Sequence, residues 1–305
     1  MIRSVTVTNY LGESIKLDLA RPELSGFAVK SITGLGPGAS TINVSEVATN
    51  DGGKFNSARI SSRNIVISLA FLWLDNTIEE LRHLSYKYFP LKRQVTLFFE
   101  TDNRRAEITG YIESNEPNIF SDQEGTDVSI ICPDPYFYSA GEDGVMTTIF
   151  SGIEPMFEFP FSNESLEENL LEMGSIVNRA EGLVRYTGDA EIGLTITIHA
   201  LGEASGLAVY DLTTQEVMRI DTDKLETLTG SGIVAGDDIV ICTVKGRKSV
   251  QLIRNGVTTN ILNCLDKNSD WFQLVKGDNI LAYTADEGAI NLQFEVSNRT
   301  AYEGV

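Results

Sequence analysis

The sequence predicts a mainly β protein of two domains, the first of which is α+β. Three features support this fold class: short runs of alternating apolar and polar residues, one segment with helical spacing, and a change in charge density near residue 140. At 305 residues the chain exceeds the usual size of one domain. Hydrophobic residues make up 42% of it, enough for folded cores, so we expect a globular protein.

Alternation identifies the strands. In the segment IGLTITIHA, Ile192, Leu194, Ile196 and Ile198 fall on one face of an extended chain, with Thr195, Thr197 and His199 on the other. The same pattern predicts strands at residues 5–10, 65–71, 95–100, 107–113, 128–132, 239–244, 249–254 and 292–296. Asn255-Gly256 predicts a hairpin turn after one of them, because both residues tolerate positive φ.

One segment, residues 76–89, has the pattern of a helix. Asn76 is placed to cap it, with Glu79 three residues later, and apolar residues recur at helical spacing from Ile78 until Pro90 ends the run. A single helix among strands is typical of an α+β domain.

Charge marks the domain boundary. Residues 1–140 hold 13 Lys and Arg against 17 Asp and Glu, net −4, whereas residues 141–305 hold 11 against 26, net −15. The strand pattern breaks over the same stretch, at PDPYFYSAGEDG. We therefore expect a first domain at 1–140 and a nearly all-β sandwich at 150–305. The net charge of −19 argues against nucleic acid as a partner, because phosphate binding relies on Lys and Arg.

No apolar run reaches the roughly 18 residues of a membrane span, so no membrane partner is expected. The N-terminal residues lack the apolar core and cleavage site of a signal peptide, which predicts synthesis in a cytoplasm. The cysteines Cys132, Cys242 and Cys264 show no CxxC spacing, and we expect buried thiols rather than disulfides.

The sequence indicates no enzyme. His83 and His199 lie in different predicted domains, and neither has the spacing of a metal ligand or the surroundings of a catalytic base. GxSxG, HExxH and phosphate-loop motifs are missing from the sequence. We therefore predict no catalytic residue, no metal ligand and no cofactor.

Two further patterns resemble ligand-binding motifs, but in both cases a loop or turn without a ligand is favoured. The run GLGPG at residues 34–38 resembles a phosphate loop, yet Pro37 removes a donor and no helix signal follows, so a flexible loop is predicted. The carboxylate pairs Asp221/Asp223 and Asp237/Asp238 fall where turns are expected, and neither continues into a calcium-binding loop.

Trp271 and Tyr210 are the candidate carbohydrate contacts, because sugars stack on aromatic rings. Packing is the favoured role for both, since Phe272 and Leu274 beside Trp271 indicate a strand that buries one face.

Several segments resemble one family, the distal tail proteins of siphophages that infect Gram-positive bacteria. In the first half they are ITGLGPG at 32–38, RNIVISLAF at 63–71, the TIEELRHLSYKYF helix that follows it, and GYIESNEPNIFSDQEGTDVSIICPDPYFYS at 110–139. In the second half they are FEFPFSNES at 157–165, GDAEIGLTITIHALG at 188–202, KGRKSVQLIRNG at 245–256 and the terminal NRTAYEGV. Their order along nearly the whole chain makes the resemblance specific.

The resemblance implies a β-sandwich-like first domain with one helix, forming a homohexameric ring, and a galectin-like β-sandwich as second domain. It implies a structural role at the tail tip of a virion, where the ring connects the tail-tube protein to the tail-associated hub protein and anchors receptor-binding proteins. The alternative is a carbohydrate-binding module that recognises cell-wall saccharide through the second domain. We also expect residues 34–53, rich in Gly, Ser, Thr and Asn, to be a mobile or partner-ordered loop.

Overall fold

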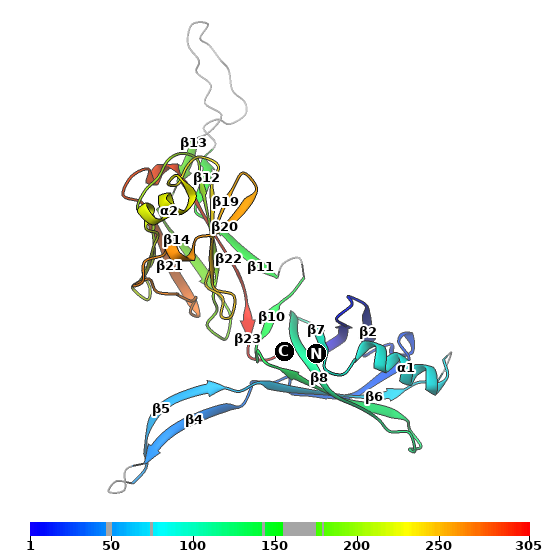
Figure 1. Ribbon diagram of the computed structural model, residues 1–305. Coiled ribbons are helices and arrows are strands. Elements are labelled where there is room, and N and C mark those ends of the chain that lie inside the picture. The colour runs from blue at the N-terminus through cyan, green and yellow to red at the C-terminus, as the bar shows by residue number, and fades with distance from the viewer. Residues whose placement is uncertain (47–50, 74–75, 142–143, 155–174, 179) are drawn as a thin grey trace, which may run out of the picture. The chain divides into compact units, whose positions relative to one another are not determined.

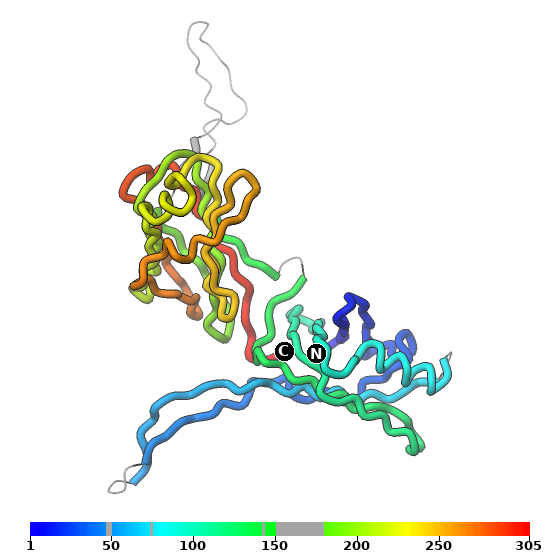
Figure 2. Tube along the Cα trace, viewed as in Figure 1, coloured from blue at the N-terminus to red at the C-terminus, as the bar shows by residue number. Residues whose placement is uncertain are grey.

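The computed structural model describes residues 1–46, 51–73, 76–141, 144–154, 175–178 and 180–305 (Figure 1). The chain divides into two compact units, Met1–Gly144 together with Ala301–Val305, and Val145–Thr300. The Cα trace in Figure 2 shows the consequence for connectivity: the chain leaves the first unit once and returns to it at its C-terminal end. The sequence-based boundary places residues 301–305 in the second domain, whereas here they pair within the first unit.

The first unit is built on one antiparallel sheet in the order β2-β1-β7-β8-β9-β6-β3, with β10 pairing β8 and β23 pairing β10. Its strands are β1 Ile2–Thr8, β2 Ser14–Asp18, β3 Phe27–Thr33, β6 Arg63–Phe71, β7 Gln94–Thr101, β8 Arg105–Pro117, β9 Gly125–Cys132, β10 Phe137–Ser139 and β23 Ala301–Tyr302. A 3₁₀ turn, Pro22–Leu24, precedes β3. Alternate residues of the central strands are buried, as in Ile65, Ile67 and Leu69 of β6. The predicted period of two therefore selects the core face.

Helix α1, Ile78–Tyr88, confirms the single helix predicted for this half. Its cap lies one residue later than the sequence predicts: the Thr77 side chain accepts a hydrogen bond from the Glu80 amide, and the Glu80 carboxylate accepts one from the Thr77 amide. The pair Asn76 and Glu79 has the same spacing, so local pattern could not separate the two registers. The structure has the capping box at Thr77 and Glu80, in a helix that buries Leu81 completely.

The second unit contains two larger antiparallel sheets. One has the order β11-β22-β15-β18-β19-β20 and the other β14-β21-β16-β17, and β12 pairs β13 separately. The strands are β11 Val145–Ile149, β12 Ser151–Glu154, β13 Ser175–Asn178, β14 Glu181–Tyr186, β15 Thr195–Ala200, β16 Ala208–Asp211, β17 Glu216–Arg219, β18 Asp238–Cys242, β19 Ser249–Arg254, β20 Val257–Asn260, β21 Gly277–Thr284 and β22 Leu292–Arg299. Short 3₁₀ turns occur at Leu262–Cys264 and Ala289–Asn291. Tyr283 of β21 stacks on Phe294 of β22 with ring centroids 5.0 Å apart, which joins the two sheets into a sandwich.

The mainly β fold class is confirmed, and each of the nine strands predicted from alternation, at 5–10, 65–71, 95–100, 107–113, 128–132, 192–199, 239–244, 249–254 and 292–296, overlaps an observed one. Ile196 and Ile198 of β15 are fully buried, as their alternation predicts. Asn255 and Gly256, with φ of 50° and 77°, form the turn of the β19–β20 hairpin. No helix in the described parts of the chain has the length and apolar character needed to cross a bilayer.

Two local predictions for the second unit are wrong. Asp221, expected in a turn, caps a second helix, α2 Thr222–Thr229, by accepting a hydrogen bond from the Lys224 amide. The segment from Trp271 to Leu274 forms no strand, and only Leu274 makes an isolated bridge, to Ile192. Burial of Phe272 and Leu274 explains the misleading alternation, because an extended segment can bury alternate residues without joining a sheet.

The capping register of α1 is testable. Thr77→Ala removes the cap and is expected to lower the local stability of the helix by about 1 kcal/mol, which speeds deuterium uptake of residues 78–88 about fivefold. Asn76→Ala is the matched control and should leave uptake unchanged. Faster deuterium uptake in the Asn76 variant alone would show that Asn76 is the N-cap, as the sequence pattern predicts.

The three cysteines are free thiols of unequal burial: Cys132 and Cys264 are buried and Cys242 is half-buried. Burial raises the pKa of the Cys132 thiol to about 11, despite the nearby Arg63, which acts in the opposite sense. At about pH 8 only about one Cys132 in a thousand is a thiolate, so iodoacetamide should alkylate Cys242 first. Peptide mapping of briefly labelled protein measures this order, with denatured protein as the control in which all three react. Equal labelling of Cys132 and Cys242 in the folded protein would be the contrary result.

Candidate assembly interface

A long two-stranded hairpin leaves the sheet of the first unit between β3 and β6. We call it the arm: β4 Ser40–Glu46 and β5 Gly53–Ile60, which pair with each other and with no other described strand. Every described residue of the arm is exposed except Ile60, which is half-buried. Figure 1 shows the arm extending away from the rest of its sheet. The arm therefore contributes nothing to the core of its own unit.

The predicted mobile loop at 34–53 is thus, for part of its length, a strand of the arm. STINVSE alternates with a period of two, but KFNSARI does not, because a register shift between Asn43 and Val44 puts Phe55 and Ala58, three residues apart, on one face. Small polar residues lie between the apolar ones in both strands, which lowers the amplitude of the alternation and favoured the prediction of a loop. When the hairpin forms, paired residues of the two strands share a face, so one face of the arm becomes apolar and the other polar.

One face of the arm is apolar. The register pairs Val44 with Phe55 and Ile42 with Ala58, so these four side chains share a face, which we call the apolar face of the arm. Ile42, Val44 and Phe55 are 59%, 49% and 61% exposed. The other face carries the pairs Thr41/Arg59, Asn43/Ser57 and Ser45/Lys54. An exposed apolar stripe opposite a polar one is typical of a surface that a partner covers.

Arg63 anchors the base of the arm. This first residue of β6 is only 6% exposed, and its guanidinium donates hydrogen bonds to the backbone oxygens of Gly34 at 2.6 Å, Pro135 at 2.7 Å and Glu303 at 2.7 Å, and also to that of Gly36. The group also lies 4.7 Å from the centre of the Phe137 ring. One buried cation therefore joins the chain entering the arm, the segment before β10, and the C-terminal residues.

The GLGPG run at residues 34–38 presents two of these four carbonyls, those of Gly34 and Gly36. Gly34 has φ of 82°, and a Cβ there would lie 2.1 Å from the backbone oxygen of Asn64. Glycine is therefore required at this position both for its backbone conformation and for close approach to β6. Val305 adds a further contact in the joint that Arg63 forms between the base of the arm and the C-terminal residues, because its amide donates to the Leu35 oxygen at 3.1 Å.

The end of the sheet opposite the arm also exposes large apolar side chains. There β3 begins and β6 ends: the Leu72 amide donates to the Gly26 oxygen at 2.8 Å, and the Phe71 amide to the Glu124 oxygen at 3.0 Å. The side chains concerned, which we call the apolar pole, are Leu24 at 68% exposure, Trp73 at 74%, Ile119 at 43% and Phe120 at 101%. The first unit thus has one exposed apolar surface at each end of its sheet.

The two candidate sugar contacts lie on either side of the same strand. Tyr210 of β16 pairs with Val217 of β17, and the backbone of Asp270, next to Trp271, bonds to Val217 from the other side. The Tyr210 hydroxyl accepts a hydrogen bond from Arg219 at 3.0 Å, and Lys248 Nζ lies 5.1 Å from the Trp271 ring centre. Both side chains are half-buried and have polar neighbours of their own. Their role in sugar binding stays a prediction.

The remaining polar candidates are held by structural contacts. His83 is exposed on α1, 3.9 Å from Glu79, while His199 contacts Asp238 at 2.6 Å across β15 and β18. Asp237 is fully buried and binds the Arg254 guanidinium at 2.6 and 2.7 Å. Among the described residues, no group of three or more His, Cys, Asp or Glu side chains is placed to hold a metal ion.

Residues 187–298 match the family model described as the siphovirus-type tail component, C-terminal domain. The resemblance to phage distal tail proteins is confirmed. The crystal structure of the SPP1 Dit protein (gp 19.1), described as a paradigm of the hub adsorption apparatus in phages infecting Gram-positive bacteria, is similar over 97% of this chain and 98% of that one, with a TM-score of 0.65 and 16% identity. At that identity the similarity establishes a shared fold across both units.

Two structures of the phage P2 baseplate in its activated conformation are more distant. The calcium form has a TM-score of 0.49 at 14% identity and the strontium form 0.48 at 13%, each covering 98% of both chains. No curated protein matches the sequence.

Arg63 is expected to be essential for the joint at the base of the arm. Arg63→Lys keeps the charge, but a single ammonium cannot reach four carbonyls in three segments, so about 3 kcal/mol of stability should be lost and residues 301–305 should become open to carboxypeptidase. Arg59→Lys, an exposed arginine on the polar face of the arm, is the matched control. Unchanged denaturation and an intact C-terminus in the Arg63 variant would show that the joint depends on other contacts.

Proposed function

We propose that this protein is a structural component of a phage tail tip, a distal tail protein without catalytic activity. It forms a homohexameric ring that connects the tail-tube protein to the tail-associated hub protein and anchors the adhesion proteins of the virion. The family match of residues 187–298 and the fold shared with the SPP1 protein over both units support the assignment. The observation that carries the assembly role is the arm, whose apolar face is exposed along its length.

A closed ring of identical copies requires two different surfaces on each copy, one meeting the other on the next copy. The apolar face of the arm and the apolar pole meet that requirement, because they lie at opposite ends of one sheet and both expose large side chains. The rigid base formed around Arg63 supports the pairing, because it restricts the direction in which the arm leaves the sheet. Burying the remaining exposed surface of Ile42, Val44 and Phe55 would contribute about 1–2 kcal/mol each, because each is already about half covered.

The adhesion role rests on the second unit. Residues Val145–Thr300 hold 11 Lys and Arg against 23 Asp and Glu, net −12, a charge that favours solubility of an exposed domain. The sandwich is the part of each copy that we assign to binding receptor-binding proteins.

The ring and the arm are tested together. Six copies of 33.5 kDa give about 201 kDa, which light scattering detects and negative-stain images should show as an open ring. Val44→Asp with Phe55→Asp places two charges on the apolar face of the arm and is expected to leave monomers, with the melting temperature unchanged because both side chains are exposed.

Asn43→Asp with Ser57→Asp is the matched control, since it adds the same charge at a paired position on the polar face. This control should still form rings. The proposal fails if the wild-type chain stays monomeric at every concentration, or if the variant of the apolar face assembles as well as its control.

A further inference from the structure

The loop between β18 and β19 concentrates positive charge on the acidic second unit. Its residues 243–249, TVKGRKS, include Lys245, Arg247 and Lys248 and contain no Asp or Glu. We call the side chains of these three residues the loop cations. The rest of the second unit, Val145–Thr300, holds 8 Lys and Arg against 23 Asp and Glu, net −15. The positive charge of the loop is therefore a local feature and not a consequence of composition.

The loop cations are exposed and have no carboxylate partner. None of them forms an ion pair or a side-chain hydrogen bond in the described part of the chain. Lys248 has one further contact, with Nζ 5.1 Å from the centre of the Trp271 ring. Other cations of the same unit, Arg185, Arg254 and Lys276, all bind carboxylates. The loop thus carries three positive charges that no neighbouring side chain neutralises.

The backbone of the loop is held in a defined turn. The Arg247 amide donates to the Val244 oxygen at 3.0 Å, and Gly246 has φ of 77°, the features of a type II turn. Just before this turn, Thr243 is fully buried, and its amide donates to the Leu194 oxygen at 2.9 Å. The loop cations therefore project from a backbone that is anchored to the sheet.

The extended segment 271–274 lies beside the loop. Leu274 forms a bridge with Ile192, and the next residue, Gly193, lies directly against the start of the loop, because a Cβ on Gly193 would be 2.4 Å from the Val244 Cα. Together with the contact between the lysine and the indole ring, this packing makes the segment and the loop neighbours on one surface of the second unit.

The segment presents two side chains to solvent beside the loop cations. Phe272 and Leu274 are buried, whereas Trp271 and Gln273 alternate with them and are half-buried. The Gln273 amide has no hydrogen-bond partner in the parts of the chain that the structure describes. An indole ring packs against the apolar face of a sugar, and an amide both donates to and accepts from hydroxyl groups. The surface therefore combines a part that attracts anions with a part suited to a hydroxylated ring.

We propose that this surface binds a phosphorylated saccharide, with the loop cations around the phosphate and with Trp271 and Gln273 against the sugar. Lysine, which supplies two of the three loop cations, is a compact point charge that suits phosphate, whereas sites for carboxylates favour the paired donors of arginine. The acidic remainder of the unit repels a long polyanion such as nucleic acid. A glycan whose phosphates are separated by neutral sugars brings few charges near the unit and is repelled less.

Biolayer interferometry with the full-length chain and immobilised dextran that carries sparse phosphate monoesters tests the proposal. The wild-type protein should bind saturably, and unmodified dextran should bind about tenfold more weakly because the loop cations then have no partner. Lys245→Gln with Arg247→Gln, which leaves the contact of Trp271 intact, should weaken binding about threefold to tenfold. Gln273→Ala should weaken it about twofold to tenfold through the loss of a hydrogen bond to the sugar. Glucose 1-phosphate should compete at lower concentration than inorganic phosphate.

Arg185→Gln with Lys224→Gln is the matched control, because it also removes one arginine and one lysine that are exposed on the second unit. This control should bind as the wild type does. Equal losses in the control and the loop variant would overturn the proposal, as would the lack of saturable binding to phosphorylated dextran.

The sugar component is tested separately. Inorganic phosphate competing as well as glucose 1-phosphate, together with unchanged binding of the Gln273 variant, would show that only the charge is recognised and would overturn the proposal. Labelled hexaglutamate binding more tightly than the phosphorylated dextran would assign the loop to an acidic peptide and would also overturn it. The site does not depend on ring formation, which light scattering on the same samples reports independently.

Discussion

The first unit depends on a buried arginine that has carbonyl oxygens as its partners. Arg63 is 6% exposed, and its guanidinium satisfies oxygens of residues 34, 36, 135 and 303. Oxygens without such a donor would be buried at a cost of about 1–3 kcal/mol each. Because the three segments are distant in sequence, the arm base, the chain leaving for the second unit and the returning C-terminal end are fixed together. The second unit can therefore be regarded as a long insertion between β10 and β23, which pair with each other.

Much of the fold could be predicted because strong patterns decide it locally. Alternation in β6 and β15 has full amplitude, and the Asn255-Gly256 turn requires positive φ at both residues. Where two local patterns compete, the sequence is insufficient. Asn76 and Thr77 both satisfy the capping rule, and only the structure shows that Thr77 is the cap. The segment after Trp271 shows a different error. Phe272 and Leu274 are buried in alternation, as in a strand, but the segment pairs with no strand.

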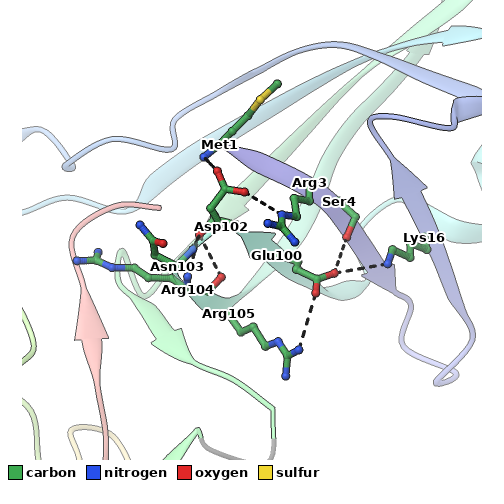
Figure 3. A network of polar contacts seen from close by, with 10 residues as sticks. Met1, Arg3, Ser4, Lys16, Glu100, Asp102, Asn103, Arg104 and Arg105 are labelled. Carbon is green, nitrogen blue, oxygen red and sulfur yellow. Dashed lines mark hydrogen bonds and ion pairs between the residues drawn. The ribbon is translucent and has the colours of Figure 1, made fainter.

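The candidate interface was harder to predict than the fold. Arg63 belongs to no sequence motif. An arginine that binds backbone carbonyls needs only several chain segments that lie close to it in the fold, and these can come from anywhere in the sequence. The ion pairs of Arg3, Lys16 and Arg105 with Asp102 and Glu100 (Figure 3) likewise have no sequence signature, because these residues come together only through the pairing of four strands. Trp271 and Tyr210 were candidates because sugars stack on aromatic rings, whereas the apolar face of the arm appears only once the hairpin pairs Val44 with Phe55 and Ile42 with Ala58.

The arm combines weak internal stability with a strong anchor, and this combination suits an assembly element. A two-stranded ribbon without a core is marginal in water, because its hydrogen bonds compete with solvent and its side chains bury little surface. Arg63 and Gly34 fix only its base, so the rest of the ribbon gains most of its stability when its apolar face is covered. In the proposed ring, ordering of the arm would then be coupled to assembly. A partner that fits poorly would not offset the entropy lost when both strands of the arm become ordered. Such coupling would therefore favour binding to a neighbouring copy whose surface fits the arm.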